Sequence, residues 1–535
     1  MKDDRHTPSF HLIPRALSTP GNLAGDVLAG GAASRLFRGV VGEGQVEVPS
    51  PRPGRLPPGV FATTSATSMG KLETILAGGG HFVTTGQQPG LFLGPLYTLY
   101  KAASAIKLAA DLERLRGVPT LAVFWVAADD HDWKEVAGCR VLATDESLVE
   151  FRVEAPAERS GRSVGESVLP ESILDEIERL AQLFGSSWDD DGSDQLDALR
   201  AGYRPGETFS GAFVSAMAEL FASHELALLD SAHPEVRAVA NGLYRDVATR
   251  APEIMDAVAK GRTSVEETGY TARLTPPESG LQLFHDSAAG RAHVLATAEG
   301  FGTPGGERWT GDLLDSNLEE HPSSFTPAAA LRPVLESWLL PVAATVLGPG
   351  ELAYWAQLNP LFEALQVEMP LVAARDSWCL VEPRVARLLG KLGVDSELVE
   401  MGEDELRRQV LDTGRPKGVA DALATLNTEI TERVERLADV ADEELPGLRS
   451  ATGKTLSSVE RALEDLGRVI DRRVAERQAT SLEQAGRLTA NLAPGGIVQE
   501  RAVGAASYLG RYGSHLVDRL VATESRYIAG LQGQD

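Results

Sequence analysis

The chain has 535 residues, of which 43% are hydrophobic and 24% charged, so it can form a large core with at least one attached module and is neither disordered nor of low complexity. Its 76 acidic and 51 basic residues give a formal net charge of −25, which disfavours a nucleic-acid partner because there is no long Lys/Arg run. The first 20 residues lack the apolar centre of a signal peptide and no run of about 18 apolar residues occurs, so we expect a soluble cytoplasmic protein without a membrane partner.

The two cysteines, Cys139 and Cys379, lie far apart in the sequence. Neither belongs to a CxxC pair or to a Cys/His spacing that would hold a metal. We expect two buried thiols in a reducing compartment and no metal site formed by protein side chains.

Residues 1–75 are predicted to be an N-terminal extension. Its proline-rich stretch, residues 48–60, is expected to be extended or looped and to connect the extension to the main domain.

Residues 76–384 are predicted to form an α/β core. Residues 81–85 form a candidate strand, residues 86–94 a glycine-rich turn, and residues 95–115 a helix whose first turn accepts Pro95. Residues 120–127 are almost all apolar, as expected of a strand buried on both faces. Together these segments predict one β-loop-α-β unit of a parallel sheet.

The same pattern recurs later in the chain. Apolar strands at 226–229 and 341–347 end in turn residues and lead into helices that start near Pro234 and Glu351. We therefore predict a Rossmann-like, doubly wound parallel sheet with insertions near 155–205 and 255–325.

Residues 385–490 are predicted to form a coiled-coil hairpin. Leu423, Ile430 and Leu437 are seven residues apart, and a second apolar pattern follows a turn near 446–453. A stutter near Arg433 and Val434 makes the repeat imperfect. Residues 491–535 are expected to form a helical tail that packs back on the core. A Gly-Lys-Thr string at 453–455 has the wrong glycine spacing for a phosphate-binding loop and follows no strand, so we reject that interpretation.

Four strings together carry a family resemblance. They are TGQQPGLFLGPLYTLYK at 85–101, VFWVAADDHD at 123–132, LGPGELAYW at 347–355, and QER at 499–501 followed by Tyr512-Gly513. In this order the strings resemble the signature segments of the cysteine-adding family of bacillithiol biosynthesis, the BshC family, over residues 80–530.

The resemblance implies a Rossmann-like core related to nucleotidyl transferases and a coiled coil that mediates homodimerisation. The alternative for the coiled coil is that it folds back as a lid on the core. It implies an ATP-dependent ligase, with Mg²⁺ accompanying ATP, that adds cysteine to the amine of glucosaminyl-malate in the last step of bacillithiol synthesis. Activation through an acyl-adenylate or through an acyl-phosphate stays open. Neither a HIGH nor a KMSKS string is present, so the sequence does not locate the ATP site.

The first candidate site is the turn after residues 81–85, where open α/β sheets bind ligands. Thr85, Gly86, Gln87 and Gln88 are predicted to bind substrate, Gly94 to approach the nucleotide, and Lys101 to lie behind this surface as a catalytic residue. The alternative is a tight β-α turn that serves packing only.

The second candidate site is the acidic segment around His131. A histidine flanked by carboxylates could act as a general base, so we predict His131 and Asp130 to be catalytic. The alternative is a solvated acidic loop in which Asp130 or Asp132 caps a helix.

The third candidate site follows residues 341–347. Gly348 and Gly350 are predicted to bind the cofactor, and Glu351 and Tyr354 the substrate. Arg332 is predicted to clamp the malate carboxylates in bidentate fashion. The alternatives are that Tyr354 packs its helix on the sheet and that Arg332 forms a surface ion pair.

Two other functions compete with the ligase. A non-catalytic, metabolite-binding coiled-coil scaffold would not require Gln87, His131 and Arg332 to share one cleft, whereas a ligase would. A tRNA-linked aminoacyl transferase is disfavoured by the charge of −25.

Overall fold

The computed structural model describes residues 9–18, 21–42, 47–155, 163–184, 190–287, 290–444 and 449–527. The chain divides into two compact units. The first contains residues 13–378 together with the segment that begins at Val503, and the second contains residues 9–12 and 379–502.

A six-stranded sheet forms the centre of the first unit. Its strands are β2 (Phe61–Thr63), β3 (His81–Gln87), β4 (Thr120–Val126), β7 (Leu226–Asp230), β13 (Val342–Leu347) and β14 (Leu371–Ala374). Their order is β14-β13-β3-β4-β7-β2, and every neighbouring pair is parallel except β2 with β7. The chain moves outward from β3 through β4 to β7 and then returns to the other side of β3 with β13 and β14. This is the predicted doubly wound order, and the direction reverses between β3 and β13.

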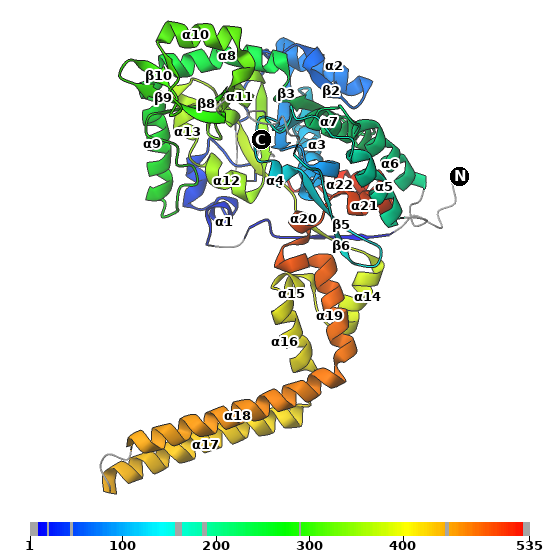
Figure 1. Ribbon diagram of the computed structural model, residues 1–535, viewed down its shortest axis with the longest axis vertical. Coiled ribbons are helices and arrows are strands. Elements are labelled where there is room, and N and C mark those ends of the chain that lie inside the picture. The colour runs from blue at the N-terminus through cyan, green and yellow to red at the C-terminus, as the bar shows by residue number, and fades with distance from the viewer. Residues whose placement is uncertain are drawn as a thin grey trace. The chain divides into compact units, whose positions relative to one another are not determined.

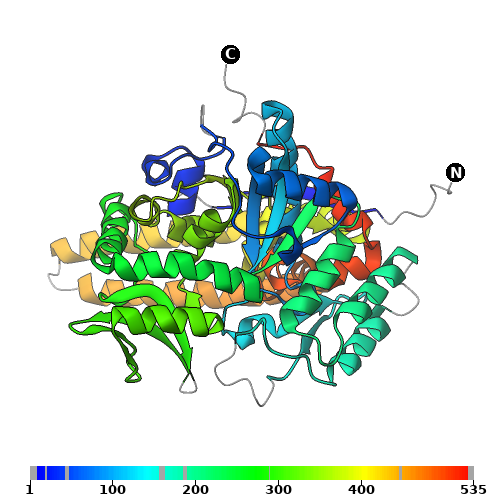
Figure 2. The same cartoon turned by 90° about the horizontal axis from the view of Figure 1, so that it is seen from above.

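Helices cover both faces of this sheet (Figures 1 and 2). Leu121, Val123 and Trp125 alternate along β4 and belong to one core with residues of α2 (Ala66–Thr74), α8 (Pro234–Thr249) and α11 (Leu331–Leu339). On the other face, Phe124 packs against Phe213 of α7 (Phe209–Leu220) with ring centroids 5.9 Å apart. All seven residues of β4 are buried, as predicted from its unbroken apolar run.

The helix after the glycine-rich turn, α3 (Tyr97–Arg116), begins two residues later than predicted. Gly94 has a φ of 68°, so the turn is still closing at this point, and Leu96 is the N-cap. Gly117, in the left-handed region at φ 65°, ends the helix. Even Lys101 and Lys107 are buried on α3, which places this helix deep inside the unit.

The stretch predicted as the second insertion contains a separate antiparallel sheet. Its order is β11-β10-β9-β8-β12. The strands are β8 (Gly280–Ser287), β9 (Gly290–Thr297), β10 (Gly300–Gly302), β11 (Arg308–Trp309) and β12 (Phe325–Pro327), accompanied by α9 (Ala251–Glu267) and α10 (Gly311–Glu320). Figure 1 shows these green strands beside α8 and α10.

Smaller elements complete the first unit. A hairpin of β5 (Gly138–Leu142) and β6 (Leu148–Arg152) precedes α5 (Ile173–Phe184) and α6 (Asp190–Gly202). The N-terminal stretch contributes α1 (Leu23–Leu28), and its residues 61–74 form β2 and α2, which add a strand and a helix to the central layers. The last two helices, α21 (Ala506–Tyr512) and α22 (His515–Val521), belong to this unit, and α22 packs on α3.

The second unit is helical and contains the predicted coiled coil. Its long helices α17 (Lys417–Glu444) and α18 (Arg449–Arg477) run side by side (Figure 1), each about 42 Å long at 1.5 Å per residue. The part of the predicted turn at 445–448 lies outside the described residues. The other helices are α14 (Pro383–Leu392), α15 (Ser396–Glu400), α16 (Glu403–Gly414), α19 (Ala479–Leu492) and α20 (Gln499–Ala502).

Among the residues that the structure describes, no helix combines the length and the apolar character that crossing a membrane requires.

Candidate functional site

The carboxyl ends of β3 and β13 lie side by side where the strand order reverses, the position at which doubly wound sheets bind ligands. Thr84 of β3 pairs with Thr345 of β13, and the Thr85 hydroxyl donates to the Val346 carbonyl at 2.9 Å. Thr85, which was predicted to bind substrate, is buried, and its hydroxyl hydrogen is engaged in a hydrogen bond between β3 and β13.

Lys101 of α3 holds this region together. Its ammonium donates to the Gly86 carbonyl at 2.6 Å, to Gln87 Oε1 at 3.0 Å and to Glu351 Oε2 at 2.6 Å. An ammonium group has three hydrogens, and these three acceptors account for all of them. Burial lowers the pKa of Lys101, and the Glu351 carboxylate opposes that shift. Because its three hydrogens are engaged by Gly86, Gln87 and Glu351, Lys101 is better placed to position the loops than to transfer protons.

Glu351 connects the carboxyl end of β13 to Lys101. It lies at the start of α12 (Pro349–Trp355), where its Oε2 also accepts from the Gly348 backbone N–H at 2.8 Å. Glu351 thus caps its own helix and pairs with a buried lysine. Its carboxylate fixes the β13–α12 turn against the end of β3.

Two arginines lie near Lys101. Arg332 of α11 pairs with Glu336 at 2.6 Å and hydrogen-bonds the Tyr354 side chain, whose pKa is raised by burial. The positive charges of Arg375 and Arg332 both act to lower the pKa of Lys101. Three cations and the carboxylates of Glu351 and Glu336 therefore gather at the reversal point, a cationic excess within a strongly acidic chain.

Arg375 is a residue that sequence reasoning missed. It directly follows β14, is only 1% exposed, and lies over the Tyr97 ring with its guanidinium carbon 5.6 Å from the centroid. The sequence did contain a signal for Arg375, because it is a charged residue directly after a short apolar run. The same arrangement led to the prediction of the segment around His131, which follows β4. The run Leu371–Ala374 was too short to be recognised as a strand.

The four predicted glycines differ in their surroundings. A Cβ on Gly86 would lie 2.7 Å from the Trp125 carbonyl oxygen, whereas a Cβ on the exposed Gly350 would meet open space. A Cβ on Gly348 would lie 3.5 Å from Arg375 Nε. The same Cβ on Gly348 would lie 3.4 Å from Glu351 Oε2, so this position lies between a carboxylate and a guanidinium, and of the four glycines only Gly350 faces open space.

Gly94 is buried in a packed turn. Its N–H donates to Leu91 at 2.9 Å and its carbonyl accepts from Ala505 at 2.8 Å. Phe92 and Leu93 have φ values of 50° and 72°, which are strained for such residues. These contacts favour the packing alternative for this half of the loop, and the predicted role of Gly94 toward a nucleotide gains no support.

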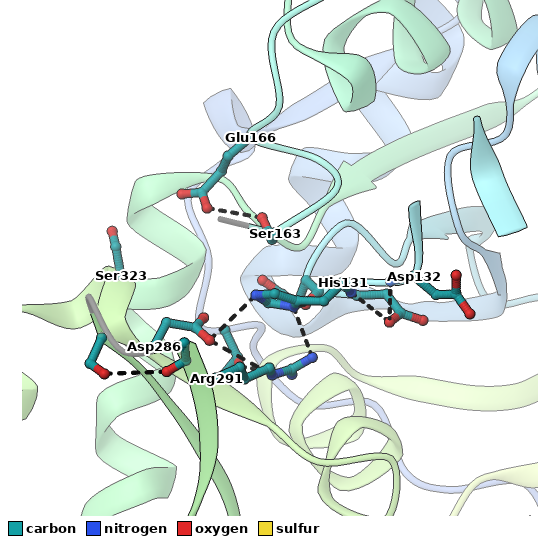
Figure 3. Close-up of polar contacts among 12 residues, drawn as sticks. His131, Asp132, Ser163, Glu166, Asp286, Arg291 and Ser323 are labelled. Carbon is teal, nitrogen blue, oxygen red and sulfur yellow. Dashed lines mark hydrogen bonds and ion pairs between the residues drawn. The ribbon is translucent and has the colours of Figure 1, made fainter. Parts of the chain in front are cut away.

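His131 lies at the centre of a polar cluster after β4 (Figure 3). Its Nδ1 is 3.1 Å from the Asp129 carbonyl oxygen and 3.0 Å from Arg291 Nη1, and its Nε2 is 3.4 Å from Asp286 Oδ1. Asp286 and Arg291 belong to β8 and β9, so the antiparallel sheet completes the surroundings of the histidine.

The carboxylates beside His131 have separate partners. Asp132 caps α4 (Trp133–Val136) by accepting from the N–H groups of Lys134 and Glu135, as the structural alternative predicted for Asp130 or Asp132. Asp130 accepts from the His131 N–H at 2.6 Å and from the side-chain amide of Gln88.

Asp129 anchors the segment to α8. It pairs with Arg237 at 2.9 Å, and Arg237 also pairs with Glu166 at 2.6 Å. Burial alone would lower the pKa of Arg237, but the two carboxylates outweigh burial and raise it. Arg237, Glu166, Asp286 and Arg291 were all missed because their positions near His131 depend on long-range packing that no local pattern reveals.

The predicted site residues thus form two groups along one edge of the sheet. Gln87 joins the group around Lys101, and the next residue, Gln88, joins the group around His131 through Asp130. The glycine-rich turn is the physical link between the two groups.

Comparisons with known proteins agree with this architecture. Residues 61–376 match the family model described as "Bacillithiol biosynthesis BshC, N-terminal Rossmann-like domain", and residues 378–527 match "Bacillithiol biosynthesis BshC, C-terminal coiled-coil domain".

Curated relatives match over most of their length. Proteins of Koribacter versatilis, Symbiobacterium thermophilum and Salinibacter ruber are 34%, 31% and 30% identical to this chain. The alignments cover 83%, 95% and 84% of this chain and 82%, 89% and 82% of the relatives. Each relative carries the name "Putative cysteine ligase BshC".

Proposed function

Because this chain belongs to the BshC family of bacillithiol biosynthesis, we propose that it is an ATP-dependent ligase that joins cysteine to the amine of glucosaminyl-malate. The observation that carries the proposal is the meeting of two polar groups at the carboxyl edge of the sheet, connected by Gln87 and Gln88. One group is rich in cations and the other contains a histidine among carboxylates.

The cationic group suits the anionic parts of the reactants. Arg332 and Arg375 are proposed to bind carboxylate or phosphate oxygens, with Gly350 allowing their approach. ATP, with Mg²⁺, supplies the activation that a cysteine carboxylate needs before its C–O bond can break. Lys101 and Glu351 keep the two strand ends at a fixed separation during this step.

The histidine group suits the amine. The glucosaminyl nitrogen is protonated at neutral pH and must lose a proton before it forms the C–N bond. His131 is proposed to accept that proton as a general base, and Asp130 to orient the segment by accepting from the His131 N–H.

The proposed enzyme acts in the cytoplasm as a homodimer. Apolar side chains of the α17–α18 hairpin, including Leu437 and Val440, are exposed in the single chain. Such a surface is typical of a protein interface, and the coiled coil is proposed to supply it.

The direct test follows product formation by the full chain. Purified protein is mixed with ATP, Mg²⁺, cysteine and glucosaminyl-malate, and bacillithiol mass and released nucleotide are measured together. Release of AMP or of ADP distinguishes the two routes of activation. We expect His131→Gln to lower kcat about 100-fold or more, the usual contribution of a general base, while the exposed His321→Gln stays within about twofold.

Folded wild-type protein that yields neither product nor nucleotide turnover would contradict the ligase proposal. That result would favour a metabolite-binding scaffold. Binding of glucosaminyl-malate, measured by calorimetry in the same sample, would then support the scaffold.

A further inference from the structure

Arg291 is held firmly in place beside His131. Its Nη2 donates to Thr326 Oγ1 of β12 at 2.9 Å, and its guanidinium carbon lies 4.0 Å from the centroid of the Phe284 ring of β8. The remaining terminal nitrogen, Nη1, lies 3.0 Å from His131 Nδ1. A third contact, the ion pair of Arg291 Nε with Asp286 Oδ1 at 3.9 Å, also holds the guanidinium. Figure 3 shows the guanidinium directed at the imidazole of His131.

This contact determines where the ring carries its proton. A guanidinium only donates hydrogen bonds, so Nδ1 must offer its lone pair to Arg291. In the neutral ring the proton then resides on Nε2, which faces Asp286 Oδ1 at 3.4 Å. The Asp129 carbonyl, 3.1 Å from Nδ1, can only accept and would favour the opposite tautomer.

We propose that Arg291 and Asp286 are positioning residues that hold neutral His131 with its proton on Nε2, so that Nδ1 is the nitrogen that acts as base. This assignment rests on the proposed function, in which His131 receives a proton from the substrate amine. A substrate carboxylate is a stronger acceptor for Arg291 than a neutral imidazole is. When Nη1 turns to that carboxylate, Nδ1 is uncovered and takes the ammonium proton, while Nε2–H stays directed at Asp286.

The titratable and charged groups around the ring come from several elements. They are Asp129, Asp130 and Asp132 on its own segment, Asp286 on β8, Arg291 on β9, Arg237 and Tyr244 on α8, and Glu166 from the turn before α5. The carboxylates favour the protonated ring and the arginines oppose it. Removing Arg291 should therefore make the ring easier to protonate, and neutralising Asp286 should make it harder.

The test reads the tautomer directly in the full chain. Protein labelled with ¹⁵N-histidine is titrated by NMR, and the signals of His131 are assigned by their loss in His131→Gln. In wild type we expect the neutral ring to show a protonated Nε2. Arg291→Met should shift the neutral ring toward a protonated Nδ1 bonded to the Asp129 carbonyl, and should raise the titration midpoint because a neighbouring positive charge is removed.

Two further variants separate this role from a general loss of structure. Asp286→Asn should lower the midpoint because a neighbouring negative charge is removed, and Arg291→Lys, which keeps the charge, should leave it near the wild-type value. Arg308→Met, on β11 of the same sheet, serves as the matched control and should change neither tautomer nor midpoint.

A wild-type neutral ring protonated on Nδ1 would overturn the inference, and so would midpoints that move in the same direction in both variants. The NMR result does not depend on turnover, so a failure of the ligase assay is distinguishable from a failure of this inference. Where the ligase assay succeeds, the acidic limb of the kcat profile should move with the NMR midpoint, upward in Arg291→Met and downward in Asp286→Asn.

Discussion

At the residue scale, close approach of backbones explains why Gly86 is found at the reversal point. In the register of β3 with β4, Gly86 lies opposite Trp125, and a Cβ at this position would be 2.7 Å from the Trp125 carbonyl oxygen. Because the obstructing atom belongs to the backbone of a central strand, it cannot move aside without disturbing the sheet.

We expect Gly86→Ala to destabilise the protein by about 1–3 kcal/mol, the usual cost of forcing an extra carbon into packed structure. Gly350→Ala is the matched control, because a Cβ there meets open space, and it should change stability by less than about 0.5 kcal/mol. Midpoints of thermal unfolding measure both. Equal midpoints for the two variants would contradict this expectation, because they would mean that β3 and β4 accommodate the added carbon without loss of stability.

Part of the candidate site could be predicted from the sequence, and the rest could not for a physical reason. Gln87, His131 and Glu351 could be predicted because each lies near the end of a predicted strand, and Lys101 because it lies on the helix that follows the glycine-rich turn. Arg291 could not, since its place beside His131 depends on how a distant sheet packs. The predicted roles of these residues stay predictions, although the three acceptors around Lys101 favour a positioning role over a catalytic one.

At the element scale, strands buried on both faces were predictable and short or half-buried ones were not. β3, β4, β7 and β13 have apolar runs that end in turn residues, and these runs sufficed for the Rossmann-like prediction. β2 and β14 have only three and four residues, so they depend on pairing with longer neighbours. In the antiparallel sheet, β10, β11 and β12 are equally short, with three, two and three residues. β8 and β9 have eight residues each, but β9 is mostly half-buried and its sequence forms no apolar run.

The segment after α22 stabilises the short strand β14 through side-chain contacts. Arg526 pairs with Asp376 at 3.0 Å and donates to the carbonyls of Ala374 and Arg375, and the Tyr527 hydroxyl donates to Ala374 at 2.9 Å. Lys107 of α3 also pairs with Asp376. β14 and the following Arg375 are thus held from the C-terminal side.

We expect Arg526→Met to destabilise the contacts around β14 by about 1–3 kcal/mol, since it removes the hydrogen bonds to the Ala374 and Arg375 carbonyls and the ion pair with Asp376, while Tyr527 and Lys107 keep their own contacts. Hydrogen exchange at residues 371–374 should then become about 5- to 150-fold faster, at 1.4 kcal/mol for each factor of ten. Arg519→Met, at an exposed position of α22, should leave that exchange unchanged. Unaltered exchange in Arg526→Met would mean that Lys107 and the sheet pairing hold β14 by themselves.

At the scale of the whole molecule, the hairpin of α17 and α18 leaves an apolar surface uncovered. Leu437 was predicted to belong to the internal seam, yet it is 60% exposed, and Val440 is 54% exposed. The seven-residue spacing from Leu423 and Ile430 does not persist, and Val434 is less exposed than Leu437. A straight helix drifts away from a strict seven-residue repeat, so later members of the repeat turn outward.

These outward residues support the proposed homodimer, and replacing two of them tests it. In a two-fold interface each substitution occurs twice, and burying a leucine or valine contributes about 1.5–3 kcal/mol. Leu437→Glu with Val440→Glu should therefore raise the dimer dissociation constant at least about 100-fold and yield a monomer of 57.0 kDa in light scattering at micromolar protein. Asn427→Glu with Thr428→Glu adds the same charge at exposed polar positions of α17 and should leave the dimer intact. A wild-type protein that already has the monomer mass at this concentration would refute the dimer, and the exposed leucine and valine would then need another partner.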